Sequence, residues 1–252
     1  PLIMEHRELA KLLGTYIDVI PTLLDEENRV HPTFIQTGAA TGRMASKDPG
    51  VQNIPIKTEL GRAIRRGFIS KKDYVARLVS EAKKTFGLIV VLFHMASNYP
   101  RAPWKKLSES DWDLAMNVIA RSTFLLGKYV GDELLQNQGE LKGKIVTISD
   151  WSVLTRPYKD YLAYNTAKTA VVGLTKSLAK ELAPHILVNS IAPGPILAPP
   201  GLTKEENEEV LSSTPLKRWG GPEEIAKAIR YLLDTDFVTG QVLFVDGGRS
   251  IA

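Results

Sequence analysis

The sequence contains no cysteine at all. This absence excludes disulfide frameworks, thiolate zinc sites, iron–sulfur clusters and cysteine nucleophiles. The four histidines lie far apart and form no H-E-x-x-H pair, so we expect no metal site. No apolar run approaches 18 residues, and the first 14 residues carry charges where a secretion signal has an apolar core. We therefore expect a cytoplasmic protein with no membrane partner.

What is present is typical of a globular chain, because 44% of the 252 residues are apolar and 24% are charged. This length suits one large domain or two small ones. The formal net charge is +4, and most of the excess lies in residues 1–72. A basic cluster there could contact phosphates, but so small an excess favours a solvated helix face. The cluster consists of Arg62, Arg65, Arg66, Lys71 and Lys72.

Residues 1–72 and 73–252 differ in composition and in the spacing of their apolar residues. In the first part, residues 3–18 have helical spacing, residues 19–57 have the prolines and glycines of extended segments joined by turns, and residues 58–70 could form a short helix running into a strand. The second part alternates helices with buried strands. Helices are predicted at 73–87, 108–137, 161–183 and 222–234, strands at 88–97, 143–150, 186–194 and 238–248, and a loop with five prolines at 193–215.

This alternation predicts βαβ units and a parallel sheet. The expected fold class is therefore α/β, a Rossmann-like doubly wound parallel sheet whose N-terminal third is atypical. The predicted division is a segment 1–72 followed by a core 73–252.

Tyr164 and Lys168 form the strongest chemical signal. Four residues apart, they lie on one face of the predicted helix. An ammonium beside a phenol favours the phenolate and lowers the phenol pKa from its usual value near 10. Tyr164 could then transfer a proton near neutral pH. A Y-x-x-x-K pair alone is weak evidence, since most such pairs are simply exposed.

The surrounding segments strengthen this interpretation. The strand VTISD precedes the pair, ILVNSIAPGPI follows it, and VTGQVLFVDGG comes near the end of the sequence. In this order, residues 73–252 resemble a short-chain dehydrogenase/reductase, in its pteridine-reductase-like or 3-oxoacyl-carrier-protein-reductase-like branch. The resemblance implies that Tyr164 is the general acid/base and that Lys168 tunes it and binds the nicotinamide ribose. It also implies a set of cofactor-binding residues, namely Ala96, Ser97, Tyr164, Lys168, Pro193, Gly194 and Ile196.

Two positions depart from the family pattern. The family places a serine or aspartate about thirteen residues before the tyrosine, to hold the substrate oxygen, but Trp151 stands there. Asp150 is our first candidate for that role and Ser152 is the alternative, while Asp150 could also merely cap a strand end. The asparagine of the family's proton relay would fall at Ile119. The nearby Asn117 is two residues away, which turns it to another side of the helix.

The first 72 residues do not fit this family. The only T-G-x-x-x-G turn, Thr37–Met44, ends in methionine where the last glycine of a dinucleotide-binding loop belongs. Only 28 residues separate it from the helix at 73, too few for the missing helix, two strands and second helix.

Residues 1–70 instead resemble the thumb-to-palm segment of family-A DNA polymerases, through the pattern T-G-R-x-x-S-x-D-P-x-x-Q-N-I-P. The resemblance implies duplex contacts by Arg43, Gln52 and Asn53. The carboxylate motifs that a two-metal polymerase needs are absent, so polymerase activity is excluded. We read the chain as an apparent chimera.

These observations favour an NAD(P)-dependent oxidoreductase that transfers hydride to a small carbonyl or imine compound. NADP is our first expectation for the cofactor and NAD the alternative, because the residues that choose between them fall in the missing region. By analogy with the family we expect a homo-oligomer and no nucleic-acid partner. Two alternatives stay open, a catalytically impaired scaffold and, less favoured, a duplex-contacting polymerase fragment.

Overall fold

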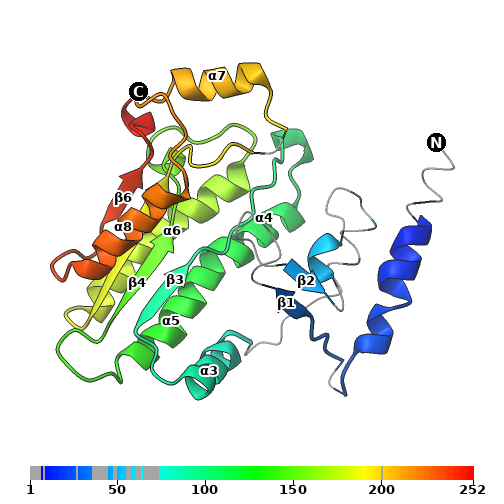
Figure 1. Cartoon of the computed structure of the whole chain (residues 1–252), viewed down its shortest axis with the longest axis horizontal. Helices are drawn as coiled ribbons and strands as arrows, with labels where there is room; N and C mark the ends of the chain where they lie inside the picture. Colours follow the sequence, from blue (N-terminus) through cyan, green and yellow to red (C-terminus); the bar gives the residue numbers. More distant parts are fainter. Residues whose placement is uncertain are drawn as a thin grey trace. The chain divides into compact units, whose positions relative to one another are not determined.

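The computed structural model is described over most of the chain. The described residues are 7, 9–26, 28–35, 45–47, 50–54, 58, 60, 64, 74–199 and 201–252. They belong to two compact units, Pro1–Lys72 and Asp73–Ala252 (Figure 1). The boundary between the units coincides with the change in composition at residue 73.

The first unit is small and mixed. A helical segment passes into a π-helix at Leu13–Ile17 and is followed by a short 3₁₀-helix at Ile20–Leu23. Strands β1 (Thr33–Ile35) and β2 (Ala45–Lys47) pair antiparallel, and a second 3₁₀-helix spans Val51–Asn53. Its described core consists of Leu12, Tyr16 and Ile54.

Several sequence-based predictions for the first unit fall outside the described residues. These are the T-G-x-x-x-G turn with Arg43, the basic cluster and most of the helix-to-strand segment 58–70. Gln52 lies in the 3₁₀-helix, and Asn53 ends it as an exposed residue.

The second unit is built on a four-stranded parallel sheet in the order β3-β4-β5-β6. The strands are β3 (Val91–His94), β4 (Gly143–Ile148), β5 (Ile186–Pro193) and β6 (Val242–Val245). Register pairs such as Ile145–Val188 align the carboxyl ends of β4 and β5. The loops that follow these two strands therefore emerge side by side.

Helices cover both faces of this sheet, as a doubly wound fold requires. Ile145 packs in one core with Leu134 of α5 (Ser122–Leu134) and Ala179 of α6 (Leu162–Leu182). Its neighbour Val146 packs in another core with Leu232 of α8 (Pro222–Asp234). Successive residues of a strand point to opposite faces, so these two residues alone define two layers. The predicted α/β class with a parallel sheet is confirmed.

The predicted helices at 73–87, 161–183 and 222–234 are confirmed within about one residue at each end. α3 (Tyr74–Phe86) ends at Gly87, whose φ of 82° allows the left-handed cap conformation, and Gly87 N donates to Lys83 O at 2.8 Å. α8 begins with Pro222 at its first turn, where a missing N–H costs nothing.

The long helix predicted at 108–137 is interrupted. Ser108 caps α4 (Glu109–Ala115) through a capping box with Asp111. A π-helical segment, Met116–Arg121, then separates α4 from α5. A π segment adds a residue to a turn, and the pattern of residues 108–137 was interpreted as one continuous helix without it.

Two further predictions were wrong. The loop 193–215 contains a helix, α7 (Lys204–Ser212), because Thr203 and Glu206 form a capping box after the prolines. The strand predicted at 88–97 is limited to β3, and Leu88 and Val90 before it are exposed. β3 pairs only with β4 among the described residues, and His94 is the one buried residue of this strand.

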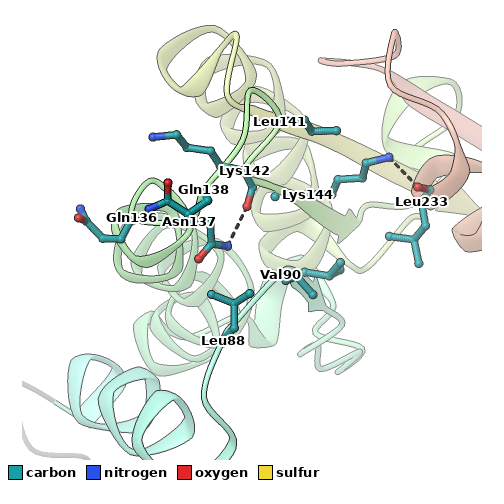
Figure 2. A pocket seen from close by; sticks show the side chains of 11 residues that line it. Leu88, Val90, Gln136, Asn137, Gln138, Leu141, Lys142, Lys144 and Leu233 are labelled. Carbon is teal, nitrogen blue, oxygen red and sulfur yellow. Dashed lines mark hydrogen bonds between the residues drawn. The ribbon is translucent and has the colours of Figure 1, made fainter.

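The exposed start of β3 borders a hollow of about 640 Å³ at the amino ends of the strands. Figure 2 shows Leu88, Val90 and Leu141 around it, together with Lys142 and Lys144, and it marks the bond from Lys144 to Leu233. Lys144 Nζ donates to Leu233 O at 2.6 Å, and Lys142 Nζ donates to Leu135 O at 2.8 Å. Backbone carbonyls thus orient both ammonium groups, and Leu88, Val90 and Leu141 supply apolar surface at this end of the sheet. Among the described residues, no helix is long and apolar enough to span a membrane.

Replacing Leu134 by alanine tests the core between α5 and the sheet. Leu134 is fully buried, so we expect Leu134→Ala to lower the free energy of unfolding by about 2–5 kcal/mol in urea titrations. Leu141→Ala is the matched control, because that side chain is 37% exposed and should cost about 1 kcal/mol or less. Equal losses for both variants would contradict this description of the core.

Candidate active site

A second hollow, of about 480 Å³, lies at the opposite, carboxyl end of the sheet. It opens where β4 and β5 end, since Asp150 follows β4 and Gly194 follows β5. The residues lining it are Tyr99, Asp150, Trp151, Tyr158, Tyr164, Pro193, Gly194, Pro195, Ile196, Leu197, Pro199, Leu202, Val210, Trp219 and Arg249. Crevices at the carboxyl ends of parallel strands are the usual ligand sites of such sheets.

Helix α6 brings Tyr164 and Lys168 to this end of the sheet. The ammonium nitrogen lies 5.9 Å from the centre of the Tyr164 ring, which confirms that the two side chains share one helix face. Lys168 Nζ donates to Ile148 O, the last carbonyl of β4, at 2.8 Å. The helix is thereby tied to the strand end, and both side chains are at least nine-tenths buried.

Asp150 faces the phenol of Tyr164 directly. Tyr164 Oη donates to Asp150 Oδ2 at 2.5 Å, while Asp150 Oδ1 accepts a hydrogen bond from Ser152 N at 2.8 Å. The carboxylate therefore closes a turn after β4 and also orients the tyrosine hydroxyl. Ser152, the alternative candidate, is fully buried and is not among the residues that line the hollow.

The electrostatics of this pair differ from the sequence-based expectation. Burial, reinforced by the negative charge of Asp150, raises the pKa of Tyr164 above its usual value of 10. The predicted lowering of this pKa by Lys168 is thus wrong for the described residues. Burial also lowers the pKa of Lys168 to about 8, against the opposing pull of Asp150. Lys168 can therefore change its charge within the physiological range.

An aromatic cluster surrounds the phenol. Tyr99 lies edge-on to Tyr164 with ring centres 4.7 Å apart and stacks on Tyr161 at 4.3 Å. Trp151 Nε1 donates to Tyr158 Oη at 2.8 Å. Burial raises the pKa of Tyr158 to about 12, so its hydroxyl stays neutral. Sequence reasoning missed this cluster, although Tyr158, Tyr161 and Tyr164 recur every three residues.

Pro193, Gly194 and Ile196, predicted as cofactor-binding residues, line the same hollow as Tyr164. Gly194 is required by a close approach of backbones, because a Cβ there would lie 2.6 Å from Asp246 Cα. Gly194 N also donates to Val245 O at 3.0 Å. The segment that leaves β5 is therefore held against the end of β6.

Ala96 and Ser97, the other predicted cofactor residues, follow the carboxyl end of β3 and are exposed. They are not among the residues that line the hollow. His94 before them is buried, with Nε2 at 3.0 Å from Ser122 Oγ of α5. Burial and then the charge of Lys168 lower the pKa of His94, so it acts as a neutral link between β3 and α5.

Asn117 and Ile119, where the sequence departs from the family's relay asparagine, lie in the π-helical segment before α5. Ile119 is buried in the π-helical segment and packs with Tyr164 and Ala167 of α6. Asn117 is exposed. An apolar side chain thus stands where the family's relay asparagine was expected. In the part of the chain that the structure describes, no three His, Cys, Asp or Glu side chains cluster as metal ligands would.

Adding a methyl group at Gly194 tests the close approach at the site. Because the new Cβ would meet Asp246 Cβ at 2.5 Å, we expect Gly194→Ala to lower the free energy of unfolding by about 1–3 kcal/mol. Gly173→Ala is the control, since nothing lies within 4 Å of that position in α6 and alanine favours helix. Urea titrations in which both variants matched the wild type would contradict the geometry.

Comparison with known proteins links this fold and site to one family. A family model described as enoyl-(acyl carrier protein) reductase matches residues 33–250. The BbsD subunit of (2S)-[(R)-hydroxy(phenyl)methyl]succinyl-CoA dehydrogenase from Thauera aromatica is 37% identical over 188 residues, which are 73% of this chain and 74% of that protein. The ligand-free aldohexose dehydrogenase of Thermoplasma acidophilum superposes with a TM-score of 0.66 at 27% identity, over 72% of this chain and 76% of that one.

A second similarity concerns a shorter segment. DNA polymerase I of Deinococcus radiodurans is 55% identical over 75 residues, which are 29% of this chain and only 8% of the polymerase. This segment is therefore similar to a small piece of a polymerase. The family model and the dehydrogenase relative, by contrast, each cover most of the chain. The chain belongs to the short-chain dehydrogenase/reductase family.

Proposed function

We propose that this protein reduces a small carbonyl or imine compound with NAD(P)H, with Tyr164 as the general acid/base. The observation that carries the proposal is the 2.5 Å hydrogen bond from Tyr164 Oη to Asp150 inside the hollow at the carboxyl end of the sheet. A phenol that is buried, oriented and open to a pocket has the geometry of a proton donor. The cofactor would supply the hydride.

In this proposal, each of the three polar side chains Tyr164, Asp150 and Lys168 has its own role. Tyr164 is protonated at neutral pH, as any phenol with a pKa of 10 or more is, so it has a proton to give to the substrate oxygen. Asp150 keeps the hydroxyl at the hollow and disfavours a lasting phenolate beside it, which promotes reprotonation of Tyr164 by a proton from solvent once the product has formed. The ammonium of Lys168 offsets part of this repulsion while the phenolate exists.

The described residues fit one half of a dinucleotide. Pro193, Gly194 and Ile196 border the hollow beside Tyr164 and would hold the nicotinamide end. Lys168 Nζ donates to Ile148 O, and Lys168 is buried and not among the residues that line the hollow, so its contact with the ribose stays a prediction. The pyrophosphate half is different. No strand and glycine-rich turn precede α3 in the described part of Asp73–Ala252, so the backbone amides that usually hold the phosphates are missing there.

This difference between the two halves of the cofactor site favours a second candidate, an impaired reductase within a chimeric chain. The polymerase similarity over 29% of the chain motivates it, together with the lack of a strand and glycine-rich turn before α3 in the described part of Asp73–Ala252. Under this alternative the site keeps its proton donor but binds the cofactor weakly. NADP in preference to NAD, a homo-oligomer and a cytoplasmic location remain predictions. A duplex-contacting polymerase fragment stays the least favoured function, because the similarity covers only 8% of the polymerase.

Titration with NADPH separates the two candidates. Trp151 and Trp219 line the hollow, so energy transfer from tryptophan to bound NADPH should rise and saturate. Tyr164→Phe should keep this titration but lose about 100-fold or more of carbonyl-dependent NADPH oxidation. Tyr231→Phe, at a half-exposed position on α8, should leave both unchanged. A titration that stays flat to millimolar NADPH would reject the reductase and favour the impaired scaffold.

The pH dependence of reduction should report Lys168. This lysine is charged below its pKa of about 8 and neutral above it, so kcat/KM for the carbonyl compound should fall as pH rises through about 8. Asp150→Asn should move the break to lower pH, because the carboxylate raises the lysine pKa. Lys168→Arg should remove the break, since a guanidinium stays charged. A profile that is flat from pH 7 to 9 in the wild type would contradict this assignment.

A further inference from the structure

Arg249 occupies an unusual place in the hollow. It begins the 3₁₀-helix Arg249–Ile251 that follows β6, and it lines the same space as Asp150 and Tyr164. Asp150 and Arg249 are the only charged residues among those that line this hollow, and the other lining residues beyond the proton donor are mainly aromatic or aliphatic. One wall of the hollow is therefore acidic and another is basic.

The guanidinium is held in a defined position. Arg249 Nη1 donates to Val210 O at 2.8 Å and also to Ser213 Oγ, at the end of α7. The central carbon of the guanidinium lies 5.5 Å from the centre of the Trp151 ring. A cation fixed on an aromatic face and a helix end loses little freedom when it binds a ligand.

No carboxylate neutralises Arg249 among the described residues, because none of the ion pairs within 4 Å involves it. The nearest acidic side chain in sequence, Asp246, accepts hydrogen bonds from Gly248 N and Ser250 N instead. Asp150 is occupied by Ser152 N and Tyr164 Oη. Within the described residues, the Nε and Nη2 atoms of Arg249 make no hydrogen bond. Neither atom is fully buried, so both are accessible to a ligand.

We propose that Arg249 binds the anionic group of the substrate, and that the substrate is an oxo acid with an apolar body. The planar guanidinium matches a carboxylate through paired hydrogen bonds. Asp150 repels an anion, so the carboxylate lies toward Arg249 and the carbonyl toward Tyr164. Trp219, Leu202 and Val210 line the same hollow and supply apolar surface for the body of the substrate. This assignment deepens the proposed reductase function and rests on it.

Binding of a matched pair of probes tests the charge requirement without any turnover. Benzoylformate carries a carboxylate beside its carbonyl, and methyl benzoylformate has the same carbonyl and ring but no charge. Quenching of tryptophan fluorescence in the absence of cofactor should give about tenfold or more tighter binding for the acid, as a charge-assisted hydrogen bond provides.

Three variants assign the preference to Arg249. Arg249→Met should bind acid and ester equally, Arg249→Lys should keep part of the preference, and Arg230→Met, at an exposed position on α8, should keep all of it. Affinity for the neutral ester is the internal reference for an intact hollow. If Arg249→Met loses the ester as well, the wild type and Arg249→Lys decide the question.

Equal affinity of the wild type for acid and ester, or a preference that survives Arg249→Met, would overturn the inference. Failure of the proposed reductase function would give a different result. A protein that prefers the acid through Arg249 but does not oxidise NADPH would retain this binding site and lose only the reductase assignment.

Discussion

A single buried hydrogen bond, from the phenol of Tyr164 to the carboxylate of Asp150, connects the fold of this protein to its chemistry. The two residues come from different elements, one from the first turn of α6 and one from the turn after β4. Their contact requires that helix and strand keep their register, which the bond from Lys168 to Ile148 O also secures. Burial then makes the charge of the carboxylate effective on the phenol.

The sheet explains why these groups meet at one end. Parallel strands place all their carboxyl ends together, and the cores on the two faces anchor α6 on one side and α8 on the other. The loops after β4, β5 and β6 then surround one hollow and contribute Asp150, Gly194 and Arg249 to it. The same architecture leaves β3 with one described neighbour and provides no described phosphate-binding turn in that unit. The proton-donating half of a reductase is thus better defined than the cofactor-binding half.

Much of this could be predicted from the sequence. The spacing of Tyr164 and Lys168 indicated a shared helix face, and continuous apolar runs indicated strands of a parallel sheet. Asp150 was the favoured candidate for holding the substrate oxygen, which stays a prediction, and the structure places its carboxylate against the Tyr164 phenol. These features depend on local periodicity and on short-range order along the chain, which the sequence records directly.

Other features depend on contacts that no local pattern records. The pKa of Tyr164 reflects its burial and a carboxylate fourteen positions away, so spacing to Lys168 alone suggested the wrong direction. Arg249 is separated from Trp151 by nearly a hundred residues, and they meet only because β4 and β6 end at the same edge of the sheet. The π-helical segment before α5 and the helix α7 arise from packing and capping within stretches whose composition indicated something simpler.

The state of the Tyr164 phenol tests the account most directly. Ring-carbon NMR of the protein labelled at tyrosine, with Tyr164→Phe to assign the resonance, follows its ionisation as pH is raised. The account predicts that Tyr164 stays protonated beyond pH 10 in the wild type and that Asp150→Asn brings its titration to lower pH, because the carboxylate raises the phenol pKa. A Tyr164 that ionises below pH 10, or one that Asp150→Asn does not shift, would contradict it.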